Sequence, residues 1–316
     1  MSGPHDPPAF FDLQVNGYAG VDFNRDGLSA DDLHAACEAI QRDGVAGFLP
    51  TVITDDLEAM GRRLARLAEL READELAQRL IVGLHVEGPF LNETPGYIGA
   101  HPTQHARPAD RESMNRLLDA GGGLVRLVTL APERDPGFAV TRLLADAGVT
   151  VAAGHCDPSR DELAAACDAG LSLFTHLGNG CPASLPRHDN VIHRALSLRD
   201  RLRFTLIADG VHLPFWFLRD VIELAGLDRC AVVSDAVTAA GLGPGRFTLG
   251  RWELEVGEDL ACRAPDRGDG GGPHLVGSAC PLSVAFERLQ TDCGLSREQA
   301  TTLTGGNPRA FLGEAA

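Results

Sequence analysis

Eight short apolar runs rich in β-branched residues recur along the first three quarters of the chain, and they constrain its fold more than any other feature. The runs lie at 10–15, 45–53, 80–86, 124–130, 149–154, 171–175, 203–208 and 230–234. Segments with helical periodicity separate most of them; one opens at the candidate cap Ser29 and closes at Gly44, and another begins at Ser159. Apolar strands alternating with helices are typical of buried parallel sheets built from βα units.

Eight such units within about 225 residues match the size of a (β/α)₈ barrel. A doubly wound open sheet is the alternative, but no GxGxxG motif follows the first run and no P-loop is present. Residues 57–78 read as one helix, 245–262 alternate like a β-hairpin, and 266–278 read as a Gly-rich turn. We therefore expect residues 1–316 to form one domain of α/β class. It would have barrel strands over about 10–234, a short hairpin at 245–262 and closing helices at about 279–311.

Composition excludes several kinds of partner. The net charge of −16 disfavours a nucleic-acid or anionic-membrane surface, and no apolar run of about 18 residues predicts a membrane span. The N-terminus is polar and Pro-rich, unlike a signal peptide, and the eight cysteines form no CxxC pair. We expect a cytoplasmic protein without disulfides or a thiolate zinc site. The negative net charge is compatible with a small anionic substrate.

Titratable side chains gather where the predicted strands end. Glu87 ends the third strand, His155 the fifth, His176 the sixth and Asp235 the eighth. Neighbouring strands lie about 4.8 Å apart, so His155 and His176 can both bind one ion near 2.1 Å, with Glu87 as third ligand. A single Glu or His at a strand end is more often a salt-bridge or core residue, but the joint pattern predicts a His₂Glu site with an open position for water.

Other polar residues fall near the same ends. Asp235 could exchange a proton with the water as general base and acid, and His101 and His212 could polarise a carbonyl or bind substrate oxygens. His85 lies two residues before Glu87, one layer deeper, and a buried structural role is the better interpretation. Two interpretations of Asp209 have equal support: it orders its loop, or it takes part in catalysis.

These segments together resemble the N-acetylglucosamine-6-phosphate deacetylase family of the amidohydrolase superfamily. The segments that carry the resemblance include "FFDLQVNG", "GLHVEGPFLN", "GAHP", "VTLAPE", "AAGHCD", "FTHLGNG", "ADGVH" and "VSDAV", and it runs from about residue 10 to 311. It implies a distorted (β/α)₈ barrel and a divalent metal, usually Zn²⁺, with Fe²⁺, Co²⁺ or Mn²⁺ as alternatives. The matching ligands are Glu87, His155 and His176, with Asp235 as base and acid and His101 at the amide carbonyl or sugar.

The resemblance also implies a substrate-binding set. Asn179 and Gly180 would lie in the loop that holds the substrate, His212 would bind its phosphate end, and Arg187 would reach the sugar phosphate of a neighbouring subunit, which implies a homodimer. Many superfamily members carry an HxH motif on the first strand for a second metal. Gln14 and Asn16 replace it here, which favours a mononuclear site.

Two departures from the family pattern affect the prediction. Family members usually build a small β-sandwich beside the barrel, and we expect it to be missing or reduced to the hairpin at 245–262. The loop after His176 reads "GNGCPASLPRHDN", a different context for Arg187 in which His188 and Asn190 could serve another polar group.

The resemblance implies a hydrolase that cleaves the acetamide of an N-acetylated amino sugar, with N-acetylglucosamine 6-phosphate as the expected substrate. An amidohydrolase acting on a different N-acyl or cyclic amide without phosphate is the alternative. A catalytically silent metabolite-binding barrel is the third hypothesis, and it predicts no bound metal.

Overall fold

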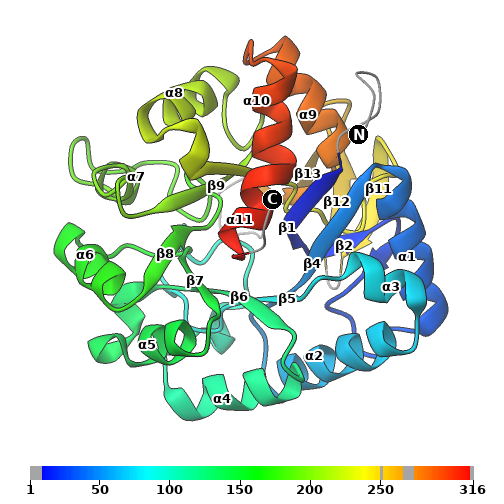
Figure 1. Cartoon of the computed structure of the whole chain (residues 1–316), viewed down its shortest axis with the longest axis horizontal. Coiled ribbons are helices and arrows are strands. Elements are labelled where there is room, and N and C mark those ends of the chain that lie inside the picture. Colours follow the sequence, from blue (N-terminus) through cyan, green and yellow to red (C-terminus); the bar gives the residue numbers. More distant parts are fainter. Residues whose placement is uncertain (1–8, 250–251, 266–273, 314–316) are drawn as a thin grey trace.

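Eight parallel strands form a barrel wall surrounded by helices in the computed structural model, which describes residues 9–249, 252–265 and 274–313 (Figure 1). The strands are β1 (Phe10–Val15), β4 (Val45–Ile53), β5 (Leu84–Glu87), β6 (Val125–Leu130), β7 (Thr150–Ala153), β8 (Leu171–Phe174), β9 (Arg203–Ile207) and β10 (Cys230–Val233). They pair in chain order from β1 to β10. The predicted barrel is confirmed, and each strand lies within its predicted run or extends one residue past it.

The barrel closes between its first and last strands largely through side chains. The Ser234 backbone N–H donates to Asp12 Oδ1 (3.1 Å), and Ser234 Oγ donates to the Gln14 carbonyl (3.3 Å). Farther along, the Asn16 N–H donates to the Ala236 carbonyl at 2.7 Å. These bonds hold the ends of β1 and β10 together, so residues that follow the two strands face each other at the barrel mouth.

Helices cover the outside of the barrel, as the βα alternation predicts. They are α1 (Ala30–Arg42), α2 (Leu57–Glu72), α3 (Glu75–Leu80), α4 (Arg111–Ala120), α5 (Ala139–Asp146), α6 (Arg160–Asp168), α7 (Val191–Leu196) and α8 (Phe215–Ala225). Ser29 caps α1, and Ser159 caps α6 in a capping box with Glu162. The single helix predicted over 57–78 is wrong, because the Asp74 side chain accepts from two backbone N–H groups and starts a new helix, α3.

Shorter elements lie in the connections. They are β2 (Gly17–Tyr18), β3 (Val21–Asp22), and the 3₁₀ turns η1 (Thr103–His105), η2 (Pro132–Arg134), η3 (Pro136–Phe138) and η4 (Leu227–Arg229).

The barrel interior is filled with apolar side chains over part of its length. A buried cluster joins Phe11, Leu13, Leu49, Leu127, Ala152, Leu173, Ile207, Ala231 and Val233 with Phe311 and Leu312 from the C-terminal segment. Because Phe311 and Leu312 pack on the inward-facing residues of several strands, they close one end of the barrel. The polar strand ends are left at the opposite mouth, where barrel active sites lie.

A four-stranded antiparallel sheet follows β10, where the sequence predicts only a hairpin. Its strands are β11 (Gly245–Leu249), β12 (Trp252–Val256), β13 (Ala261–Ala264) and β14 (His274–Ser278). The hairpin matches β11 and β12, but the chain adds two strands because Cys262, Ala264 and Val276 bury one face together with Leu254 and Val256. Residues 266–273 of the predicted Gly-rich turn lie outside the described residues, whereas 274–278 form β14 and pair with β13.

The closing helices are α9 (Leu282–Thr291), α10 (Arg297–Thr301) and α11 (Asn307–Phe311), with a π-helical turn, η5 (Thr302–Gly306), between the last two. Asn307 Nδ2 donates to the carbonyls of Leu227 (2.7 Å) and Cys230 (2.6 Å), which fixes α11 to the start of β10. Over the described part of the chain, no helix has both the length and the apolar character to cross a bilayer.

Candidate active site

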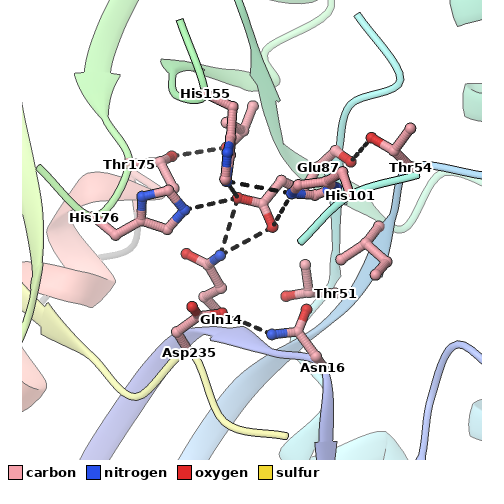
Figure 2. Close-up of polar contacts among 12 residues, drawn as sticks. Gln14, Asn16, Thr51, Thr54, Glu87, His101, His155, Thr175, His176 and Asp235 are labelled. Atoms are coloured by element: carbon pink, nitrogen blue, oxygen red, sulfur yellow. Dashed lines mark hydrogen bonds and ion pairs between the residues drawn. The ribbon is translucent and has the colours of Figure 1, made fainter. Parts of the chain in front are cut away.

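Tight backbone turns at the strand ends direct the predicted site residues toward one another (Figure 2). Glu87 is the last residue of β5, and His155, His176 and Asp235 each lie two residues beyond β7, β8 and β10. These last three adopt positive φ angles of 50°, 34° and 49°. Such angles cost a non-glycine residue about 1–3 kcal/mol and are typical of functional sites.

Glu87, His155 and His176 form a compact group of ligand atoms. Glu87 Oε1 lies 2.9 Å from His176 Nε2 and 3.4 Å from His155 Nε2, and one ligand atom of each residue lies within 4.8 Å of the others. His155 Nδ1 donates to the Tyr97 carbonyl at 2.8 Å, which leaves Nε2, the nitrogen facing the carboxylate, as the one that can bind a metal. Two acceptors that face each other fit a cation between them, so the residues suit a divalent metal.

His101 reaches the same point from the loop after β5. Its Nε2 lies 3.2 Å from His155 Nε2 and 3.8 Å from Glu87 Oε2. Burial lowers the pKa of His101 to about 3, which keeps the imidazole neutral at physiological pH. A neutral imidazole beside the metal ligands can donate a hydrogen bond to a substrate oxygen without adding a charge.

The two amides at the end of β1 bind the carboxylates of the site. Gln14 Nε2 donates to both oxygens of Glu87, at 3.1 Å each, and Asn16 Nδ2 donates to Asp235 Oδ1 at 2.7 Å. Burial raises the pKa of Asp235 to about 6, with smaller contributions from His176, which lowers it, and Glu87, which raises it. A carboxyl with such a pKa can both accept and return a proton near neutral pH.

His85 has the structural role that the sequence analysis favours. It is fully buried below Glu87, with Nε2 2.8 Å from Thr129 Oγ1 and Nδ1 3.3 Å from Thr51 Oγ1. Burial lowers its pKa to about 4. His85 is therefore a neutral polar link between three strands of the barrel wall.

Asp209 orders its loop and orients His212, which is the first of the two roles considered for it. Its Oδ1 accepts from the N–H groups of Val211 (2.9 Å) and His212 (2.8 Å), and its Oδ2 contacts His212 Nδ1 at 2.6 Å and accepts from Ser278 Oγ at 3.0 Å. Burial would raise the pKa of Asp209, but these contacts, led by His212, hold it below its usual value. His212 Nε2 is buried without a hydrogen-bond partner among the described residues.

A cavity of about 360 Å³ opens over these residues. The predicted site residues that line it are Glu87, His101, His155, His176, Asn179, Gly180, His212 and Asp235. Asn24, Asp55, Arg63 and Gln104 also line it, and they could not be predicted because no sequence motif marks them. Arg63 Nη1 donates to Asp55 Oδ2 at 2.8 Å, so its charge is already paired within the chain.

Comparisons with known proteins agree with this chemistry. No family model matches the chain. It is 34% identical to the N-acetylglucosamine-6-phosphate deacetylase of Homo sapiens and 33% identical to that of Bos taurus, over 97% of its own length and 74% of theirs. The chain belongs to the N-acetylglucosamine-6-phosphate deacetylase family. The solved N-acetyl-D-glucosamine-6-phosphate deacetylase of Mycobacterium smegmatis aligns with 100% of this chain and 83% of its own chain, with a TM-score of 0.85 and 29% identity.

The loop after His176 leaves Arg187 outside the cavity of its own chain. Arg187 is exposed and does not belong to the set of described residues that line the cavity. Asn190, considered for polar recognition, instead caps α7 by accepting from the His193 N–H at 3.1 Å. That suggestion for Asn190 is wrong, because its oxygen is engaged by the helix N-terminus.

A partly buried hydrogen-bond chain behind His155 was also missed, although its residues lie in the segments "GPFLN", "LAPE" and "AAGHCD". Glu133 Oε1 accepts from Asn92 Nδ2 (2.9 Å) and from the Asp157 N–H (2.6 Å), and the Asn92 N–H donates to the His155 carbonyl (3.0 Å). We call Asn92, Glu133 and Asp157 the brace. It ties the loops after β5, β6 and β7 together around the backbone of His155.

Two glycines of the family motifs pack directly on the His155 ring. A Cβ at Gly180 would lie 2.8 Å from His155 Nδ1, and one at Gly99 would lie 3.0 Å from Cε1. Both residues have positive φ, 60° and 58°. Gly180 thus lines the cavity as predicted, and its lack of a side chain also makes room for the imidazole.

Proposed function

We propose that this protein is a metal-dependent deacetylase that hydrolyses N-acetylglucosamine 6-phosphate to the amino sugar phosphate and acetate. The observation that carries the proposal is the convergence of Glu87, His155 and His176 beside Asp235 at one barrel mouth. The sequence relatives support the substrate, because their names specify this deacetylation.

Each residue of the site has its own role in the reaction. A divalent metal, for which Zn²⁺ is our choice, would be held by Glu87, His155 and His176 and would supply Lewis acidity, which lowers the pKa of a water toward about 7 and polarises a carbonyl. Asp235 takes the proton of the attacking water as general base. The neutral His101 donates to the carbonyl oxygen as negative charge develops on it. Asp235 then gives its proton to the leaving nitrogen, and acetate and the amine separate.

The sugar phosphate is assigned to the other side of the cavity. His212, held by Asp209, directs its unpartnered Nε2 into the site, beside Asn179 and Gly180. We assign Arg187 to the active site of a second subunit in a homodimer, because it is exposed outside its own cavity. A monomeric mass by light scattering would remove that assignment. We place the protein in the cytoplasm, since all eight cysteines are free thiols.

Acetate release from a panel of substrates tests the proposal. The panel contains N-acetylglucosamine with and without the 6-phosphate, N-acetylgalactosamine 6-phosphate, and other N-acyl and cyclic amides. A relative from Escherichia coli O157:H7, 29% identical, is an N-acetylgalactosamine-6-phosphate deacetylase, which places that sugar in the panel. We expect the highest kcat/KM for N-acetylglucosamine 6-phosphate and a loss of about 10³-fold or more in Asp235→Asn with metal content retained. Preference for an amide without phosphate would favour the alternative substrate class.

A further inference from the structure

We propose that Asn16 orients the scissile amide, with its Oδ1 accepting a hydrogen bond from the substrate N–H. This role rests on the proposed function, because it requires an amide substrate whose nitrogen receives the proton of Asp235. Neither the resemblance nor the predicted ligand set assigns Asn16 any contact with the substrate.

The orientation of the Asn16 side chain is fixed from two sides. Its backbone N–H donates to the Ala236 carbonyl at 2.7 Å, and its Nδ2 donates to Asp235 Oδ1 at 2.7 Å. An ionised carboxylate only accepts hydrogen bonds, so the atom facing Asp235 must be the amide nitrogen. Figure 2 shows this nitrogen directed at Asp235 and the oxygen turned away from it.

The oxygen of that amide is an unused acceptor inside the site. Asn16 is 7% exposed and lines the cavity, and its Oδ1 is buried without a hydrogen-bond partner among the described residues. Nearby donors already have other acceptors. Gln14 Nε2 donates to Glu87, Thr51 Oγ1 to the Leu49 carbonyl at 3.3 Å, and Asn24 Nδ2 to the Thr51 carbonyl at 2.9 Å. Buried acceptors are rarely left unpaired in native proteins, so this oxygen fits a donor that arrives with the substrate.

The reaction brings one such donor to this place. Asp235 must come within about 2.6–3.2 Å of the scissile nitrogen to protonate it. Asn16 donates a hydrogen bond to Asp235 and therefore lies beside the same nitrogen. The substrate amide N–H is therefore carried to the neighbourhood of Asn16 Oδ1. The hydrogen stays on this nitrogen throughout, so the contact can persist until the amine leaves.

Holding the N–H also sets the direction of the nitrogen lone pair. When water adds to the carbonyl carbon, the nitrogen becomes pyramidal and its lone pair must face the proton on Asp235. That proton passes to the nitrogen, the C–N bonding pair goes to the nitrogen, and the carbonyl re-forms as acetic acid, which loses its hydroxyl proton to water as acetate. With its N–H fixed on Asn16 Oδ1, the nitrogen presents its lone pair to the adjacent carboxyl group.

The test compares an amide with an ester that lacks the N–H. Wild type and Asn16→Ala are assayed on N-acetylglucosamine 6-phosphate and on glucose 6-phosphate acetylated at the 2-hydroxyl. We expect Asn16→Ala to lower kcat/KM for the amide by about 10–100-fold, and for the ester by at least several-fold less. Removing Nδ2 disturbs Asp235 for both substrates, so the difference between the two losses isolates the contact of Oδ1.

Controls separate this role from a structural one. If Asn16→Ala folds poorly, Asn16→Leu, whose side chain has a similar volume to asparagine, replaces it and should also lose more kcat/KM for the amide than for the ester. Metal content and Tm are measured for both variants. Gln14→Met removes a hydrogen-bond donor to Glu87, and this variant should lose kcat/KM by the same factor for the amide and the ester. If the Asn16 variants lose kcat/KM equally for the amide and the ester, the role assigned to Asn16 is wrong, and the proposed function is unaffected. Wild type without activity on the amide would instead contradict the proposed function, and this role with it.

Discussion

Asp12 is a single residue on which the closure of the barrel depends. Its Oδ1 accepts from the backbone N–H groups of Ser234 (3.1 Å) and Gln14 (3.3 Å), in place of a regular ladder between β10 and β1. The side chain is buried, and burial raises its pKa to about 7 against the opposing hydrogen bonds of Ser234 and Gln14. The folded chain therefore holds a proton on Asp12 that the unfolded chain releases near pH 4.

This difference predicts a pH-dependent loss of stability. Between about pH 4 and pH 7 the unfolded chain has released the Asp12 proton and the folded chain has not, so the contribution of Asp12 falls as pH rises, by up to about 4 kcal/mol. Asp12→Asn keeps an acceptor oxygen and removes the titration. We expect the Tm of the variant relative to wild type to rise from pH 4 to pH 7 and then level off. A difference that stays constant over this range would contradict the raised pKa.

The convergence of Glu87, His155 and His176 could be predicted from sequence because strand ends in a parallel barrel meet at one mouth. Placing these three residues together required only correct strand bounds and the spacing of one βα unit between His155 and His176. The contacts of Asn16 and Glu133 could not be predicted, because they depend on which loop atoms lie opposite each side chain. Gln14 and Asn16 could be identified as replacements for histidines, but their carboxylate partners lie 73 and 219 residues away.

At the scale of elements, the brace fixes the turn that follows β7. Asn92 comes from the loop after β5, Glu133 from η2 and Asp157 from the segment before α6, so one carboxylate oxygen, Glu133 Oε1, joins three connections. The salt bridge of 2.8 Å between Arg194 on α7 and Asp157 extends this link to the next helix along the chain. The positive φ of His155 is thereby held from outside the metal site.

The brace predicts a change in metal affinity without a change in ligands. Glu133→Ala removes the acceptor for Asn92 and Asp157, and we expect metal affinity to fall about 10–100-fold, since supporting hydrogen bonds contribute this much at metal sites. Glu133→Gln keeps one acceptor oxygen and should lose much less. Competition with a fluorescent chelator measures both, with the Tm of the metal-free proteins as control. Unchanged affinity in Glu133→Ala would show that the brace does not position His155.

Elements were predictable wherever a periodic pattern was long. The eight barrel strands and the caps Ser29 and Ser159 follow from apolar runs and cap residues alone. The break between α2 and α3 was missed because its cap, Asp74, lies within a continuous helical pattern. Strands β13 and β14 were missed because they are short and pair across a Gly-rich segment.

At the scale of the whole molecule, one end of the barrel is packed and the other carries the chemistry. Phe311 and Leu312 close the apolar end, and the cavity at the opposite end collects residues from Asn16, just after β1, to Gly277 in β14. Aspartate and glutamate outnumber lysine and arginine, 44 to 28, so binding of an anionic sugar depends on local groups such as His212 and Arg187 rather than on the net charge. The antiparallel sheet contributes Leu275, Val276 and Gly277 to the cavity wall.

Under the proposed function, one cation held by Glu87, His155 and His176 is required for hydrolysis of the amide. The most direct measurement titrates metal-stripped protein with Zn²⁺ and follows acetate release from N-acetylglucosamine 6-phosphate, with metal content determined at each point. We predict no activity without metal, a linear rise to one ion per chain, and no further rise beyond it. Full activity in protein that contains no metal, or a rise that continues to two ions per chain, would contradict this account.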